Sequence, residues 1–377
     1  MEFLIDTAEL QRIAGLLSVA AKMNTDDPSG RIYINAKEDN SVLFLANNGE
    51  TGISIVSTKA TVKESDSVVI SYGKTKSFIT SFTPWNETYG AKEFCFKSTE
   101  AGMFVTVVNV NEDGKKSKGR LKLDTYDVHS VRRPEPFKKA DFILNSSIFK
   151  AALNKVLYAI DPHDSRSFIR GMNVRFDDDC IYFAGTNGTK LSEYKIKNIS
   201  ELKKGSFIFR HDFIMGLRRA LGDETQIFFE IEKGKIKVSF DDVYFWGNLI
   251  IGENYPDYSD NLVDFTDVIR LNKDVLMNIL IPSKDVFNPD DYHRITFHID
   301  DRKLKIYNDY ASFEYEGEIE CPREFIIDVS GASMLDTISA IKDDVLLLKF
   351  SNDMGCLIFD SGNFEDQKAL ITPIKRR

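Results

Sequence analysis

The sequence has little of what redox, metal-binding and membrane proteins need. Its 377 residues contain four cysteines and no Cys-x-x-Cys pair. Three of them, Cys95, Cys180 and Cys356, interrupt strand-like runs, where a reduced thiol packs as a small hydrophobic group. The fourth is Cys321. No apolar run approaches the roughly 18 residues of a membrane span. We therefore expect structural thiols and no membrane-spanning segment.

A secretion signal is also missing. The first residues, MEFLIDTAEL, are acidic and lack the basic and apolar regions of a signal peptide. The composition, 42% hydrophobic and 28% charged, is typical of a soluble globular chain of roughly two to three domains. These features predict a cytoplasmic protein.

Motifs for phosphate binding are absent or incomplete. The Gly-Lys-Thr of residues 73–75 would need a glycine five residues before Gly73, where Val68 stands. The Gly-rich segment 185–190 leads into a strand-like run rather than a helix, so a hairpin turn is the favoured interpretation. Residues 177–179, three aspartates, are explained in the same way by a turn.

Candidate catalytic residues are equally few. The five histidines are scattered. Only Asp161, His163 and Asp164 lie together, and a metal or acid-base role would suit them. A polar loop after a helix, stopped by the proline of an Asp-Pro pair, is the favoured interpretation. We expect no enzyme activity, no metal and no cofactor.

What the sequence does contain is a long internal repeat. Stretches beginning at Met1, Asp141 and Asp267 each read as a short apolar strand followed by an amphipathic helix, with starts 140 and 126 residues apart. This spacing exceeds that of solenoid repeats, so the repeating unit is a whole domain. A second strand and helix follow in each third, and the six predicted helices span residues 7–23, 72–82, 145–160, 210–222, 272–284 and 330–342.

Pairs of strand-like runs separate these helices. Each pair joins two β-branched or aromatic stretches across Asp, Asn, Gly or Lys, as hairpins do. The predicted hairpins span residues 31–48, 93–110, 172–188, 226–240, 294–309 and 345–361. The sequence thus predicts an α+β fold of six half-domains, each a helix with a sheet.

Two short segments are typical of domain joints. Residues 129–140 carry two prolines and five basic residues, and residues 254–265 mix Pro256 with turn formers and acids. Neither is long or low in complexity, which favours domains in a fixed relation. The predicted domains are 1–135, 136–258 and 259–377.

Charge is divided unevenly between the helices and the remainder. The chain carries a net −9, whereas the six predicted helices sum to +8 and all other residues to −17. A basic helical surface would suit a phosphate backbone, and an acidic exterior would repel it. Ordinary solvated helix faces are the alternative interpretation.

Specific residues carry a family resemblance. The segment RGMNVRFDDDCIYFAGTNGTKLSEYKI from Arg170, the YPDY from Tyr255 and the terminal ALITPIKRR resemble the bacterial DNA polymerase III beta subunit, or beta sliding clamp, family in order and spacing. The threefold repeat extends the resemblance over nearly the whole chain. A divergent, phage-encoded clamp with its own polymerase is one form that it could take.

The resemblance implies a DNA clamp fold. Three repeated domains per chain, each of two helix-plus-sheet halves, would form a homodimeric ring with helices around the hole and sheets outside. Such a ring would slide on duplex DNA without reading its sequence. The implied partners are a DNA polymerase, a clamp loader and other proteins with clamp-binding motifs. A clamp-like scaffold that does not stably encircle DNA is the alternative.

The resemblance also implies a hydrophobic pocket for partner peptides between the second and third domains. A short turn and a terminal strand would leave an apolar groove for an extended peptide. The matching positions are Ile169, Thr186, Gly188, Thr189, Lys190, Leu191, Pro256, Tyr292, Ser333, Met354, Cys356, Leu370, Ile371, Thr372, Pro373, Ile374 and Lys375.

Several positions depart from the family pattern. Residues 187–190 replace the usual Asp-Gly-His-Arg, Ser259 and Asp260 replace bases, and Thr372 replaces a frequent methionine. We therefore predict a less basic pocket with its own peptide specificity. The candidate DNA contacts are Lys22, Lys74, Lys76, Lys150, Arg166, Arg218 and Arg219.

Overall fold

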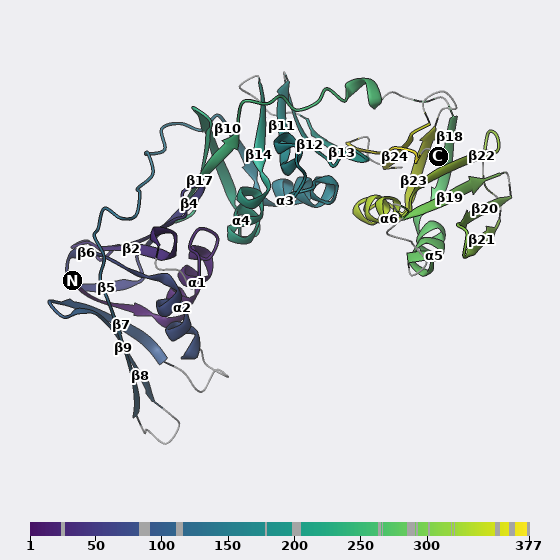
Figure 1. Cartoon of the computed structure of the whole chain (residues 1–377). Coiled ribbons are helices and arrows are strands. Elements are labelled where there is room, and N and C mark those ends of the chain that lie inside the picture. The colour runs from purple at the N-terminus through teal and green to yellow at the C-terminus, as the bar shows by residue number, and fades with distance from the viewer. Residues whose placement is uncertain are drawn as a thin grey trace. The chain divides into compact units, whose positions relative to one another are not determined.

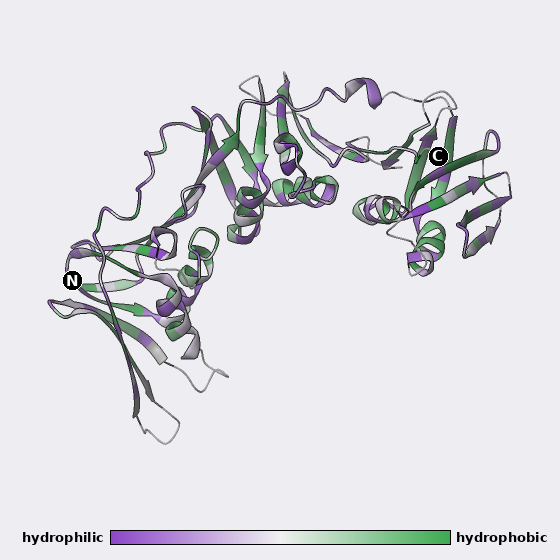
Figure 2. Ribbon diagram, in the orientation of Figure 1, coloured by the Kyte–Doolittle hydropathy of each residue, from purple (hydrophilic) through white to green (hydrophobic). Residues whose placement is uncertain are grey.

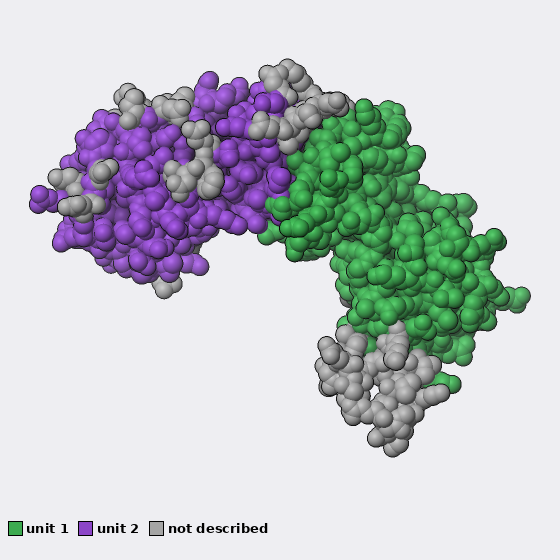
Figure 3. Space-filling view, turned by 180° about the vertical axis from the view of Figure 1, so that it is seen from behind, with its two compact units in different colours: residues 1–147, 212–249 green, residues 148–211, 250–377 purple. Residues whose placement is uncertain are grey.

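The chain folds into two compact units. The structure, a computed structural model, describes residues 1–23, 27–82, 91–110, 116–177, 179–197, 205–262, 265, 267–284, 291, 293–300, 302–317, 319, 321–350, 355–361 and 366–374. Unit 1 comprises Met1–Ser147 and Asp212–Leu249, and unit 2 comprises Ile148–His211 and Ile250–Arg377 (Figure 3). The predicted second domain contributes to both units, and the three domain boundaries remain a prediction.

Six strand–helix pairs appear in the described residues, as the repeat predicts (Figure 1). The helices are α1 (Thr7–Leu17), α2 (Tyr72–Ser81), α3 (Ser146–Val156), α4 (His211–Ala220), α5 (Lys273–Ser283) and α6 (Gly331–Ala340). Each follows directly on a strand, in the order β1 (Glu2–Asp6), β6 (Asp66–Ser71), β10 (Phe142–Asn145), β14 (Gly205–Arg210), β18 (Asp267–Asn272) and β22 (Phe325–Ser330).

Capping residues explain several of these direct transitions. The last residue of the strand is Asp6, Asn145, Asn272 or Ser330, and its side chain accepts a hydrogen bond from an amide of the first helical turn. Such a cap satisfies one of the amide groups that a helix start leaves without an intrahelical partner. The strand can therefore end and the helix begin at adjacent residues.

Two helices end several residues earlier than predicted. Helix α1 stops at Leu17 rather than near residue 23, because the amides of Ser18, Val19 and Ala20 bond to carbonyls three residues back and tighten the chain out of the α-helix. Helix α3 stops at Val156 and continues as a 3-10 turn over Leu157–Ala159.

The six predicted hairpins are confirmed. They are β2 (Arg31–Ala36) with β3 (Val42–Asn47), β7 (Ala91–Thr99) with β8 (Gly102–Val110), β11 (Gly171–Asp177) with β12 (Cys180–Thr186), β15 (Gln226–Glu232) with β16 (Lys235–Phe240), β19 (Arg294–Ile299) with β20 (Lys303–Tyr307), and β23 (Val345–Phe350) with β24 (Leu357–Ser361). The other strands are β4 (Thr51–Ser57), β5 (Ala60–Glu64), β9 (Lys116–Leu123), β13 (Lys190–Ile196), β17 (Val243–Ile250), β21 (Ser312–Glu316) and β25 (Gln367–Ile371).

Unit 1 contains two sheets. One has the order β5-β1-β7-β8-β9, and the other runs β10-β15-β16-β17-β4-β3-β2-β6. The antiparallel pair β4–β17 joins strands that lie almost 200 residues apart in the sequence, with Val243 opposite Ile55. This junction links the predicted first and second domains within one sheet.

Unit 2 repeats the arrangement. One of its sheets runs β14-β11-β12-β13-β25-β24-β23-β18, and the other runs β21-β20-β19-β22. Here the antiparallel pair β13–β25 is the junction, with Leu191 opposite Leu370. Strands of the predicted second and third domains therefore share this sheet.

The hydrophobic cores lie between helices and sheets within each unit. Residues of opposite hydropathy alternate along many strands (Figure 2), as a half-buried sheet requires. In unit 1, Phe213 of α4 stacks on Phe245 of β17 with ring centroids 4.8 Å apart. In unit 2, Phe149 of α3 meets Phe183 of β12 edge to face at 6.2 Å. Such aromatic pairs fix how each helix sits on its sheet.

Candidate functional site

The β12–β13 turn is held rigidly by one side chain. Oδ1 of Asn187 accepts hydrogen bonds from the amides of Thr189 and Lys190 at 3.0 and 2.9 Å. Gly188 has φ +90°, a left-handed backbone conformation that residues other than glycine rarely adopt. The hairpin turn predicted for residues 185–190 is confirmed, and its backbone geometry is fixed.

The terminal strand lies against this turn. Strand β25 pairs antiparallel with β13, and beyond it the amide of Thr372 donates to the carbonyl of Thr189 at 2.9 Å. Two residues later the amide of Ile374 donates to the carbonyl of Asp328 in β22 at 2.7 Å. The end of the described chain thus bridges the turn and strand β22.

A cavity of about 330 Å³ opens beside the turn and the terminal strand. The structure brings together eleven of the seventeen predicted pocket residues in its lining: Ile169, Thr186, Gly188, Thr189, Lys190, Leu191, Pro256, Cys356, Leu370, Thr372 and Pro373. These come from five separate parts of the sequence. Ligand pockets typically measure roughly 300 to 1,000 Å³ and are lined mainly by apolar side chains, so a cavity of this size is large enough to bind a ligand.

The remaining predicted pocket residues lie elsewhere. Ser333 is buried at the start of α6, where its amide bonds to Ser330 Oγ at 3.2 Å. Ile371 belongs to the buried core of unit 2, and Ile374 follows the cavity-lining Pro373. Tyr292, Met354 and Lys375 lie outside the described residues.

Six lining residues were not predicted for this pocket: Arg166, Phe168, Tyr255, Asp257, Tyr258 and Asn261. Five of them flank an assigned position, since Phe168 precedes Ile169 and the others surround Pro256. The two tyrosines of the YPDY segment were the available signal, because tyrosine combines a large apolar ring with a polar hydroxyl and is enriched at interfaces. Arg166, a candidate DNA contact, also lines this cavity.

The wall of the cavity is a small aromatic cluster. Tyr258 is buried against Ala184, Leu191 and Leu370, and its hydroxyl donates to Glu193 Oε2 at 2.7 Å. Burial raises the pKa of Tyr258, and the nearby Glu193 carboxylate raises that pKa further. The tyrosine therefore remains neutral and forms a stable apolar wall.

The cations at the cavity are already paired within the chain. Lys190 Nζ lies 2.7 Å from Asp336 Oδ2 of α6. The Arg166 guanidinium contacts Asp164 at 2.8 and 2.9 Å and holds the pKa of that carboxyl well below its usual range. Both cations are neutralised locally, so the cavity offers mainly apolar contacts.

The other candidate DNA contacts lie on or beside helices. Lys22 follows α1, Lys74 and Lys76 belong to α2, Lys150 belongs to α3, and Arg218 and Arg219 form the last turn of α4. Lys22, Lys74, Arg218 and Arg219 are exposed, while Lys76 and Lys150 are half-buried. Cations near a helix C-terminus also favour the helix itself, because the carbonyl ends there carry partial negative charge.

The polar cluster at residues 161–164 forms a turn. Asp161 Oδ1 accepts a hydrogen bond from the amide of His163 at 2.9 Å, and Asp164 pairs with Arg166. Across the described ranges, no group of three or more His, Cys, Asp and Glu side chains is placed to hold a metal ion. All four cysteines are free thiols, and Cys180 and Cys356 are buried. Among the described helices none is long and apolar enough to cross a membrane.

The central part of the chain matches a known protein family. Residues 143–257 match the family model described as DNA polymerase III beta subunit, central domain. A beta sliding clamp of Buchnera aphidicola subsp. Acyrthosiphon pisum (strain APS) is 24% identical over 172 residues, 45% of this chain and 46% of that protein. A beta sliding clamp of Buchnera aphidicola subsp. Rhopalosiphum padi is 23% identical over 243 residues, 63% and 66% of the two chains. The matched regions thus span about half to two thirds of these relatives.

Solved structures resemble the chain over its full length. The DNA polymerase III subunit beta from Pseudomonas aeruginosa has a TM-score of 0.87 at 14% identity, covering 100% of both chains. The DNA polymerase sliding clamp from Bacillus subtilis has a TM-score of 0.86 at 15% identity, again over 100% of both. The chain therefore has the DNA clamp fold that the sequence predicts.

Proposed function

We propose that this chain, a divergent member of the beta sliding clamp family, is a DNA sliding clamp: a homodimeric ring that encircles duplex DNA and tethers its partners. The observation that carries the proposal is the cavity of about 330 Å³ lined by the turn, the Pro256 segment and the terminal strand. The protein would act without catalysis or a cofactor, in the cytoplasm. Enclosure of the DNA would give processivity without tight binding.

Partner proteins would dock in that cavity through short peptides. A replicative polymerase, a clamp loader and other proteins with a clamp-binding motif would each insert Leu or Phe anchors from an extended segment. Because Lys190 and Arg166 are paired internally, apolar contacts would supply most of the affinity. This supports a peptide specificity distinct from that of clamps with a basic turn.

The helices would face the DNA. The proposed contacts lie in both units: Lys22, Lys74, Lys76, Arg218 and Arg219 in unit 1, and Lys150 and Arg166 in unit 2. Cations at these positions can meet phosphates without reading bases. Arg12 of α1 is not among the proposed DNA contacts, because its guanidinium pairs with Glu9 and Asp242.

Free sheet edges support ring closure by two copies. Strand β9 is the last strand of its sheet in unit 1, and its exposed residues include Lys118, Arg120 and Lys122. Beside it, α2 brings the half-buried Phe82 close to Gly119. An edge strand presents a row of backbone N–H and C=O groups with which a second strand can pair.

Strand β21 is a matching edge in unit 2. It ends the sheet β21-β20-β19-β22, and its exposed residues include Glu314 and Glu316. Helix α5 packs near this strand and carries Ile281, which is 55% exposed. Pairing β9 of one copy with β21 of the other would continue the sheet, cover both apolar groups and close a head-to-tail dimer.

Light scattering coupled to size exclusion tests the ring. A mass near twice 42.9 kDa at micromolar concentration supports it. A monomer at that concentration would instead favour a clamp-like scaffold that binds partners without enclosing DNA.

A further inference from the structure

The turn after β3 repeats the β12–β13 turn, which lines the 330 Å³ cavity of unit 2 that is proposed to bind partner peptides and is called the peptide cavity below. Within each turn the asparagine, Asn48 or Asn187, accepts hydrogen bonds through Oδ1 from the amides two and three residues later, at 3.0 and 2.9 Å in both cases. The next residue, Gly49 or Gly188, has φ of 93° or 90°. The two turns are therefore equivalent positions of the internal repeat.

The strands that meet the two turns are equivalent as well. In unit 1 the amide of Asn248, in β17, donates to the carbonyl of Glu50 at 3.0 Å. In unit 2 the amide of Thr372, just after β25, donates to the carbonyl of Thr189 at 2.9 Å. The β4–β17 junction thus has the same construction as the β13–β25 junction.

The connecting segments match too. Pro134 and Glu135 line a cavity at the β4–β17 junction, and Pro256 and Asp257 line the peptide cavity at the other. Each pair is a proline followed by an acid, next to an Asn-Gly turn. A second pocket therefore exists at the repeat-related place in unit 1.

This second cavity is smaller because a tryptophan fills part of it. Gly52 faces Trp246 across the β4–β17 pair, where the peptide cavity has Leu191 facing Leu370. A Cβ atom on Gly52 would lie 2.0 Å from the Trp246 ring, so only glycine admits the indole there. The remaining volume is about 50 Å³, which exceeds the roughly 10 to 15 Å³ that one water needs. A single small group fits, whereas two apolar anchors do not.

The lining of the second cavity is basic. It includes four cations and two acids, a net charge of +2 in a chain of net −9: Arg132, Arg133, Lys235, Lys237, Glu50 and Glu135. Lys235 is paired with Glu135 at 3.0 Å. In the described part of the chain, no carboxylate lies within ion-pair distance of the Arg132 guanidinium. Positive charge therefore remains available in the cavity.

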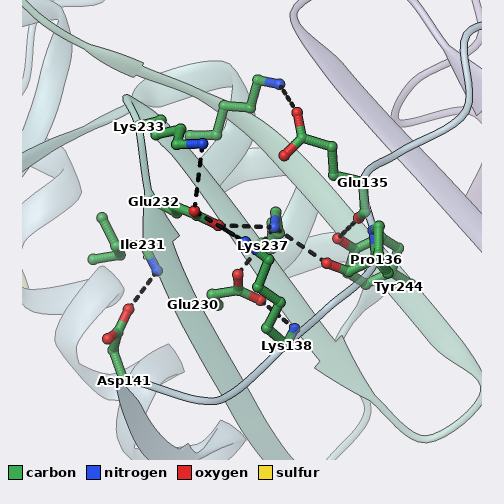
Figure 4. Close-up of polar contacts among 11 residues, drawn as sticks. Glu135, Pro136, Lys138, Asp141, Glu230, Ile231, Glu232, Lys233, Lys237 and Tyr244 are labelled. Carbon is green, nitrogen blue, oxygen red and sulfur yellow. Dashed lines mark hydrogen bonds and ion pairs between the residues drawn. The ribbon is translucent and has the colours of Figure 1, made fainter.

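One wall of the cavity is the segment around Glu135 and Pro136, which hydrogen bonds hold against the sheet (Figure 4). Buried Lys237 donates from Nζ to Glu230 Oε1 at 2.9 Å and to the carbonyl of Pro136 at 3.2 Å. The hydroxyl of Tyr244 donates to the carbonyl of Glu135 at 2.7 Å. A ligand would meet a wall already in place, which lowers the entropy cost of binding.

The cavity lies on the sheet face opposite the helices. Phe245 of β17 packs on Phe213 of α4, and because side chains alternate along a strand, Tyr244 and Trp246 point to the other face. In Figure 1 the segment that follows β9 runs along that face of unit 1. DNA contacts on the helices would leave this cavity free for a different ligand.

We propose that this junction cavity is a second binding site, which receives a carboxylate or phosphate group carried by an acidic segment of a partner protein. The Arg132 guanidinium would pair with the anionic group, and the Trp246 ring would pack on the adjacent chain. A guanidinium with two parallel N–H groups matches an oxyanion in this way. The proposal depends neither on ring formation nor on the peptide cavity of unit 2.

Trp246 itself reports on the site. The chain has two tryptophans, so Trp85→Phe leaves Trp246 as the only indole. Its fluorescence is titrated with an acetylated, amidated Asp/Glu-rich peptide, with the Asn/Gln counterpart of that peptide, and with inorganic phosphate. We expect a saturable change with the acidic peptide and affinity at least about tenfold lower for the neutral one, since the neutral peptide lacks the charge-assisted hydrogen bond to Arg132.

Matched variants separate the site from general charge effects. Arg132→Gln should weaken the acidic peptide by about tenfold and Arg132→Lys should restore part of the affinity. Lys233→Gln, which removes a cation 82% exposed outside the cavity, should leave binding unchanged. Equal responses to both peptides, a response to inorganic phosphate with none to the acidic peptide, or an Arg132→Gln titration that matches wild type would each overturn the proposal.

Discussion

Lys190 and Asp336 form an ion pair, with Nζ 2.7 Å from Oδ2, that ties the turn of the peptide cavity to helix α6. The lysine side chain is only 9% exposed. Asp336 does not line the cavity, but it neutralises the charge of Lys190, which does.

Asp336→Asn should leave the Lys190 ammonium without its carboxylate. We expect a loss of about 1 to 3 kcal/mol in the free energy of unfolding, because a buried charged group loses its partner. Affinity for a clamp-binding peptide with a carboxylate near its anchors should rise, since the ammonium can now bind it. Urea unfolding and fluorescence anisotropy measure the two effects. Asp260→Asn, an exposed acid near the cavity, is the control, and identical behaviour of the two variants would refute the assignment.

The apolar wall of the cavity gives a second prediction. Leu370 is 6% exposed and lines the cavity opposite Leu191. Leu370→Ala should weaken a peptide with Leu and Phe anchors by about tenfold, because burial of such a side chain contributes about 1.5 to 3 kcal/mol. Ile326→Ala removes an apolar side chain that is 52% exposed and outside the cavity. Calorimetric titration should show unchanged affinity there, and equal losses for both variants would contradict the location of the pocket.

A third prediction concerns acid stability. The Glu9 carboxylate is buried in unit 1, where it accepts hydrogen bonds from Arg12 at 2.9 and 3.1 Å and from Ser57 at 2.9 Å. The Arg12 guanidinium, more than any other group, lowers the pKa of Glu9 from its ordinary 4.5 to about 2. A lowered pKa in the folded state stabilises the fold above pH 4.5, and this contribution is lost as the pH falls from 4.5 toward 2.

Glu9→Gln should therefore be less stable than wild type at pH 7 by about 1 to 3 kcal/mol. The difference should shrink steadily below pH 4.5 as the wild-type carboxylate takes up its proton. Urea unfolding at several pH values measures it. Glu38→Gln, at an exposed turn position, supplies the reference, and a difference that does not change with pH would exclude Glu9 as the cause.

The proposed ring makes a fourth prediction. Charge reversal of β9 by Lys118→Glu and Arg120→Glu should place acids beside Glu314 and Glu316 of the partner's β21, and like charges on adjacent strands destabilise pairing. The mass in light scattering should then fall toward the monomer. Adding Glu314→Lys and Glu316→Lys should restore the dimer. Lys37→Glu, in an exposed turn, should leave the mass unchanged, and a β9 variant that remains dimeric would move the interface elsewhere.

The local features of the fold could be predicted from the sequence because their signals are local. Alternation of apolar residues predicts each hairpin, and a strand ending in Asp6 or Asn272 predicts a helix start through its capping side chain. The end of α1 at Leu17 was missed, since alanines at 20 and 21 continue a helical pattern but pack as buried residues of a tightened turn.

The junctions between distant strands could not be predicted from the sequence. Nothing local indicates that Trp246 faces Gly52, or that Lys190 pairs with Asp336, because each contact depends on the register of strands or helices far apart in the chain. Pro256 was assigned to the pocket from the sequence, but Tyr255 and Tyr258, which line the cavity beside it, were not. The predicted turn residues lie together because one asparagine fixes that turn.

The protein is proposed to enclose DNA as a closed ring, and its retention on circular DNA in high salt tests this directly. A linear plasmid, onto whose ends a closed ring can thread, is incubated with the purified protein, ligated into a circle and washed in high salt by gel filtration. The circle is then cut once with a restriction enzyme. High salt releases phosphate contacts but leaves a closed ring linked to a circle. We predict protein that stays with the circle through the wash and leaves after linearisation. Protein lost from the circle in high salt, or kept equally on the linear form, would contradict a sliding clamp.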